Sequence, residues 1–144
     1  MTMAKPDENE RNWAAAAHGS ALLNLFVPGI GGIIGALVIL LTQKEKSAWV
    51  AFHSKQSLVF QSVVFIILLV VVGGSWAVGF IFSFLTIGFG ALIAVPVMFV
   101  TFFLGIVIGA AGMVYSLYGA YRVYQNQSFE YALAGNWVKL HWIS

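Results

Sequence analysis

The sequence has no cysteine, which excludes disulfides, iron–sulfur clusters and thiolate zinc sites. Charge is also scarce, because only 8% of the 144 residues are charged, against about 25% in ordinary globular proteins. The five carboxylates lie in or near the termini or in a basic segment, so no acid–base pair can form within the apolar part of the chain. The sequence therefore predicts a protein that is not an enzyme and has no catalytic residues.

Apolar residues are abundant, at 60% of the chain, with a mean hydropathy of +0.91. Since a helix needs about 20 apolar residues to cross a bilayer, the chain has room for a bundle of three to four hydrophobic helices and for no separate soluble domain. We predict an all-α integral membrane protein. The net charge of +2 comes from cations scattered through short polar segments, which indicates membrane orientation and not nucleic-acid binding.

Charge and turn residues divide the chain into seven predicted segments. They are a polar N-terminal segment (1–11), a broken hydrophobic region (12–43), a basic loop (44–55), a transmembrane helix (56–82), a turn (83–96), a second transmembrane helix (97–122) and an interfacial aromatic tail (123–144). The loop from Lys44 to Lys55 contains three lysines against one glutamate. By the positive-inside rule we predict that this loop and the C-terminus are cytoplasmic, in a multi-pass protein.

The region 12–43 is uncharged but is interrupted at Pro28 and Gly29. One interpretation is a single kinked crossing, which places the N-terminus outside. The other is a re-entrant hairpin of two helices of about 14 residues, each too short to cross alone, which places the N-terminus inside. The sequence leaves both open.

Several polar side chains lie in or near the apolar regions and form a candidate polar intramembrane face. They are His18, His53, Gln56, Ser57 and Gln61. Three of them recur every four residues and so share one face of a helix. Hydrogen bonding between helices is the favoured interpretation, with a proton or solute path and a haem or chlorophyll ligand at His18 or His53 as alternatives. Two histidines without carboxylates or cysteines do not predict a metal site, but in a hairpin they would be able to meet.

A stripe of small residues follows one face of the last crossing, at Gly105, Gly109, Gly112, Ser116 and Gly119. Such a stripe permits close helix packing, either within the chain or against another copy or subunit. Interfacial positions are predicted for Trp49, Arg122, Trp137 and Trp142, and Tyr131 is predicted to be half wet beside the last two.

Three features carry a family resemblance: AAAAHGSALL around His18, the Pro28–Gly29 break, and KSAWVAFHSKQSLVFQ leading into the second hydrophobic region. Over Trp13 to Tyr131 the chain resembles a family of small prokaryotic membrane proteins of unknown function. That family is similar to the channel-forming subunit of the chloroplast inner-envelope protein translocon. The resemblance implies a bundle of three or four helices in a bacterial cytoplasmic (inner) membrane and supplies no settled activity.

The favoured function is that of a non-enzymatic accessory or structural subunit of a larger membrane complex, in contact with the bilayer and with other membrane subunits or further copies of itself. A transport or protein-translocation component is one alternative, because of the resemblance and the polar face. A pigment- or haem-binding subunit is another. No cofactor is otherwise predicted.

Overall fold

The computed structural model describes residues 5–132 and 134–142, and every regular element in those ranges is a helix. The predicted all-helical fold class is confirmed. The chain divides into two compact units. Unit 1 contains the described residues up to Val63 and those from Gly112 onward, and unit 2 is Val64–Ala111.

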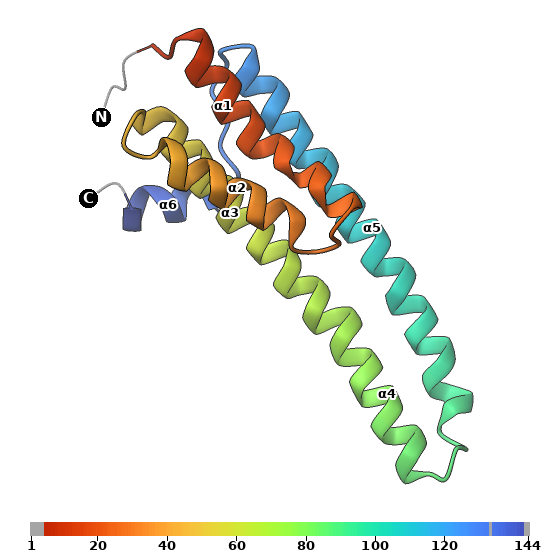
Figure 1. Ribbon diagram of the computed structural model, residues 1–144. Coiled ribbons are helices and arrows are strands. Elements are labelled where there is room, and N and C mark those ends of the chain that lie inside the picture. The colour runs from red at the N-terminus through yellow and green to blue at the C-terminus, as the bar shows by residue number, and fades with distance from the viewer. Residues whose placement is uncertain (1–4, 133, 143–144) are drawn as a thin grey trace. The chain divides into compact units, whose positions relative to one another are not determined.

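Unit 1 starts with a helical hairpin and is completed by segments from distant parts of the chain (Figure 1). Its elements are α1 (Glu8–Gly19), the 3-10 helix η1 (Ser20–Leu25), α2 (Gly31–Gln43), most of α3 (Ala48–Leu68), the end of α5 (Ala91–Tyr124) and α6 (Ala134–Trp142). A capping box begins α1: the Asp7 carboxylate accepts from the Glu10 amide at 2.7 Å, and the Glu10 carboxylate accepts from the Asp7 amide at 3.0 Å.

The two arms of the hairpin are joined by a bend at Pro28 and Gly29. Gly29 has a φ of +83°, a left-handed conformation that glycine adopts without steric cost. Close packing of the arms requires a second glycine, since a Cβ on Gly31 would collide with the Leu23 carbonyl. The break seen in the sequence is therefore a tight reversal of the chain and not a kink in one long helix.

The core of unit 1 combines small residues of α1 with larger side chains from elsewhere. Ala14 and Ala17 have no exposed surface, so α1 approaches its neighbours closely. The other core members are Ile39, Val50, Val123, Phe129, Tyr131 and Ala134. Residues from both ends of the sequence thus share one apolar cluster.

Unit 2 consists of the end of α3, the π-helical turn η2 (Leu69–Gly73), α4 (Gly74–Leu85) and the first part of α5. The two long apolar helical stretches are Ala48–Leu85 and Ala91–Tyr124, and only 6% and 11% of their most apolar windows are buried. Their parts within unit 2 are each about 21 residues, or roughly 30 Å, which matches the hydrocarbon thickness of a bilayer. By length and composition, both helices are suited to cross a membrane.

Small residues let the helices of unit 2 pack closely. A Cβ on Gly105 would lie 2.6 Å from Val72, and one on Gly79 would lie 3.0 Å from the Met98 sulfur. Ser75 and Thr101 are hydrogen-bonded across the pair at 2.8 Å. The pair is therefore held by backbone proximity and a polar contact, as expected for helices in lipid.

Helices extend further than the predicted segments. The range 44–55, predicted as a loop, is a short turn followed by α3 from Ala48, since the residues after Ser47 continue the helix that leads into the apolar run. The predicted turn 83–96 contracts to residues 86–90, where Thr86 Oγ1 accepts from the Gly90 amide at 2.7 Å and satisfies the backbone locally. Pro96 consequently lies inside α5.

We predict that Gly105→Ala destabilises the protein by about 1–3 kcal/mol, because its Cβ would overlap the stiff Val72 side chain. Thermal unfolding in mild detergent measures the effect. Gly109→Ala is the matched control, since its nearest neighbouring atom lies at 3.9 Å, an ordinary contact distance. Equal midpoints for the two variants would show that this contact does not limit packing.

Candidate functional site

Unit 1 encloses a group of polar side chains that we call the buried polar cluster, and each member is at most 8% exposed. Its members are His18, Ser20, His53, Gln56, Ser57, Gln61, Ser116 and Tyr131. All five residues of the predicted polar face belong to it. The structure adds Ser20, Ser116 and Tyr131.

A chain of hydrogen bonds runs through the ring side chains of the cluster. The Tyr131 hydroxyl donates to Ser116 Oγ at 3.1 Å, so its oxygen accepts from His18 Nδ1 at 3.0 Å. With Nδ1 as the donor, His18 Nε2 accepts from His53 Nδ1 at 3.1 Å. Both histidines are neutral in this arrangement. These hydrogen bonds connect α1, α3, α5 and the segment before α6.

A second set of hydrogen bonds ties the hairpin to α3. Ser57 Oγ donates to the Ala17 carbonyl at 2.7 Å, and the Gln61 amide donates to Ser57 Oγ at 2.8 Å and to Ser20 Oγ at 3.2 Å. Gly32 is required beside this amide, because a Cβ there would overlap Gln61 Oε1. The polar face of α3 is thus matched to the backbone of the hairpin.

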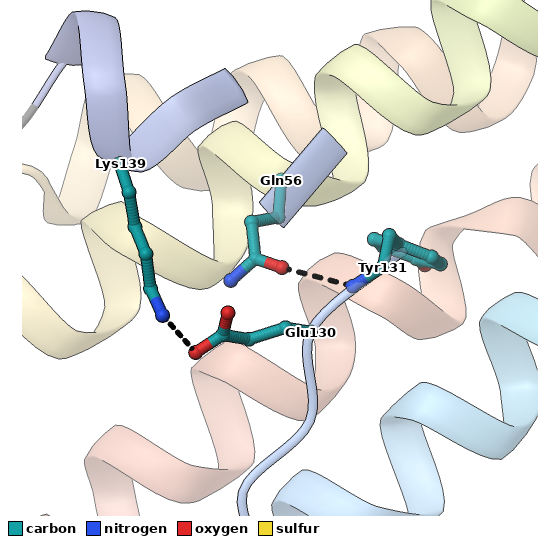
Figure 2. A network of polar contacts seen from close by, with 4 residues as sticks. All are labelled: Gln56, Glu130, Tyr131 and Lys139. Carbon is teal, nitrogen blue, oxygen red and sulfur yellow. Dashed lines mark hydrogen bonds and ion pairs between the residues drawn. The ribbon is translucent and has the colours of Figure 1, made fainter. Parts of the chain in front are cut away.

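Gln56 holds the segment before α6. Its Oε1 accepts from the Tyr131 amide at 3.2 Å, and Glu130 and Lys139 form an ion pair at 2.6 Å beside it (Figure 2). That ion pair is half exposed, so it contributes at most about 1 kcal/mol. The Gln56 contact is buried and is the stronger restraint on the tail.

Aromatic rings surround Tyr131. Its ring stacks on Phe60 with centroids 4.1 Å apart and meets Phe129 and Tyr115 edge-on. Burial raises the pKa of the Tyr131 phenol, so the hydroxyl keeps its proton and remains a donor at neutral pH. The prediction that Tyr131 is half wet is wrong, because only 2% of it is exposed. The neighbouring rings cover its aromatic body, and its hydroxyl finds hydrogen-bond partners inside the cluster.

The cluster is poorly suited to hold a metal or pigment. Both ring nitrogens of His18 are used within the protein, which leaves His53 Nε2 as the one imidazole nitrogen of the pair without a partner among the described residues. The described residues contain no group of three His, Cys, Asp or Glu side chains that could bind a metal. His53 is enclosed by Trp49 and Phe52, with ring centroids at 4.5 and 5.5 Å. The arrangement serves to join helices.

The predicted interfacial residues have different surroundings. Trp49 packs on His53 in the first turn of α3, whereas Arg122 donates to the Tyr118 hydroxyl at 2.8 Å near the end of α5. Trp137 is 43% exposed and stacks on His141. The side chain of Trp142 lies outside the described residues.

The small-residue stripe is divided between the two units. Gly105 and Gly109 face Val72 and Leu68 within unit 2. In unit 1, Ser116 belongs to the buried polar cluster, Gly119 packs on the Phe129 ring, and Gly112 is half-buried in α5. Most of the stripe is therefore occupied by contacts within the chain.

A comparison with family models finds a match over most of the chain. The model of the magnetosome magnetite crystal formation protein family, MamF/MmsF, matches residues 9–138. The chain belongs to this family. The match contains the whole buried polar cluster and all of unit 2. Searches of curated proteins and of solved structures find no match.

Membership of the MamF/MmsF family is a more specific statement than the resemblance drawn from the sequence. Both describe a small membrane protein, and that coarser part is confirmed. The comparisons give no support to the likeness to the chloroplast translocon subunit. They also give no support to the pigment-binding alternative.

Sequence reasoning missed three members of the cluster. Ser116 was predicted only as part of the small-residue stripe, and Ser20 was not among the residues of the predicted polar face. Tyr131 is 113 residues from His18, and no periodicity connects the two. Partners that far apart are set by tertiary structure and leave no local pattern.

We predict that Tyr131→Phe lowers the free energy of unfolding by about 1–3 kcal/mol, because it leaves His18 Nδ1 and Ser116 Oγ without their buried partner. Thermal unfolding and limited proteolysis of the C-terminal segment in detergent measure the loss. Tyr124→Phe is the control, since Tyr124 is 58% exposed. If Tyr131→Phe unfolds at the same temperature as the wild type, the hydroxyl does not stabilise the protein.

Proposed function

We propose that this chain is a non-enzymatic accessory protein of the magnetosome membrane that supports magnetite crystal formation. The observation that carries the proposal is the MamF/MmsF family match over residues 9–138. Unit 2 supplies the membrane anchor, through two apolar helices of about the length that crosses a bilayer.

An accessory role is supported by how the polar groups are used. The histidines, glutamines and serines of the buried polar cluster bond mainly to one another and to the backbone. The carboxylates lie outside the cluster, and among them Glu10 and Glu130 are held by Ser47 and Lys139. Catalysis needs a reactive group with access to substrate, and these contacts provide none.

The proposed role includes other subunits of the magnetosome membrane. Stretches of unit 2 present large apolar side chains outward, such as Phe84 and Leu92, at 85% and 78% exposure. In a bilayer, lipid or a neighbouring membrane protein covers such a surface. The small-residue faces are mostly filled within the chain, so an accessory protein of this kind would meet its neighbours through these larger side chains.

Deletion of the gene in a magnetite-producing bacterium is expected to alter the size or shape of the crystals, and the wild-type gene is expected to restore them. Electron microscopy of isolated crystals measures the effect. A tagged copy, followed by immunoblot, is expected in the purified magnetosome membrane. Unchanged crystals after deletion, with the tagged protein found only in the bulk cytoplasmic membrane, would contradict the proposal.

A further inference from the structure

The two ends of the N-terminal hairpin meet. Ser47 Oγ, in the turn after α2, donates to Glu10 Oε1, in the first turn of α1, at 2.6 Å. A single crossing of the membrane would separate these residues by the hydrocarbon thickness, about 30 Å. Their contact puts the start of α1 and the lysine turn, which contains Lys44 and Lys46, at the same end of the hairpin.

The arms of the hairpin are too short to cross. The uncharged part of the first arm, from Asn12 through the end of α1 and the six residues of η1, is about 24 Å long, and α2 with its 13 residues is about 20 Å long. Each is longer than one leaflet's share of the hydrocarbon core, about 15 Å, and shorter than the whole core. No Asp, Glu, Lys or Arg occurs from Asn12 to Gln43. The hairpin has the length and the composition of a segment that enters one leaflet and returns.

Several backbone groups at the bend are paired within the protein. The amides of Val27 and Gly31 donate to carbonyls four residues earlier, each at 2.9 Å. The Gly32 amide donates to Asn24 Oδ1 at 3.0 Å, and Ser20 Oγ donates to the Gly32 carbonyl at 3.0 Å. A non-helical turn at membrane depth is tolerated only when its polar groups are paired in this way.

The hairpin presents an apolar surface away from the buried polar cluster. At the bend, Leu25 and Phe26 are 65% and 81% exposed, and Val38 and Leu41 of α2 are more than half exposed. Its polar residues Ser20 and Asn24 are turned the other way, into contacts with the protein. Such a surface needs a nonaqueous partner.

We infer that residues 12–43 form a re-entrant hairpin whose exposed apolar face contacts the acyl chains of one bilayer leaflet, entered from the side of the lysine turn. The N-terminus then lies on the same side of the membrane as Lys44 and Lys46. Lipid is the partner that we infer for this surface, because the apolar surface continues around the bend and the charged residues of the hairpin are confined to its opposite end. This inference stands independently of the role in magnetite formation.

The absence of cysteine allows a direct test by single cysteines. In right-side-out and inside-out vesicles, Lys5→Cys and Lys46→Cys are expected to react with a membrane-impermeant maleimide from the same side. Phe89→Cys, in the turn between α4 and α5, is the control for the opposite side. Labelling of Lys5→Cys together with Phe89→Cys would overturn the inference, because a single crossing places them on one side.

A second measurement identifies what covers the hairpin. Phe26→Cys carrying an environment-sensitive fluorophore is expected to resist aqueous quenchers and to lose most of its emission to lipids brominated on the acyl chains. Lys46→Cys with the same label is the control and should show the reverse. Resistance of Phe26→Cys to both quenchers would indicate a protein partner, and quenching from water would indicate exposure. Either result overturns lipid contact.

Discussion

The hydrogen bond between His18 and the Tyr131 hydroxyl is the contact on which unit 1 depends. It joins α1 to the segment before α6, and Tyr131 extends the connection to Ser116 of α5, while His18 extends it to His53 of α3. An unpaired polar group in this position would be costly to bury, so the hydrogen bonds that pair His18, Tyr131 and Ser116 favour one arrangement of the helices. The apolar core of small alanines and aromatic rings is compatible with many arrangements, and the buried polar cluster selects one.

The direction in which the hydrogen bonds from His53 to Ser116 donate explains why both histidines are neutral. The tyrosine donates to serine, so each imidazole donates through Nδ1 and His18 accepts through Nε2. Adding a proton to His18 would remove its acceptor and place a charge in a site with no exposed surface. The cluster is suited to holding helices together and unsuited to carrying charge.

Much of the fold followed from local features of the sequence. The apolar runs predicted the helices, and the four-residue spacing of His53, Ser57 and Gln61 predicted their shared face. Helix ends were less predictable, since the lysines of 44–55 indicated a loop although α3 already begins at Ala48. The burial of Tyr131 was not predictable, because it depends on Phe60 of α3 and Tyr115 of α5, which are distant in sequence, as well as on its near neighbour Phe129. Periodicity describes one element at a time and cannot show which elements meet.

The reversal at Pro28 and Gly29 has a mechanical consequence for the membrane. In the inferred arrangement, residues 12–43 add cross-sectional area to one leaflet, whereas two helices that crossed the bilayer would add equally to both. An unequal area strains a flat bilayer and is relieved when the more crowded leaflet becomes convex. The protein would therefore favour bent membrane over flat membrane, with the lysine turn on the outer side of the bend.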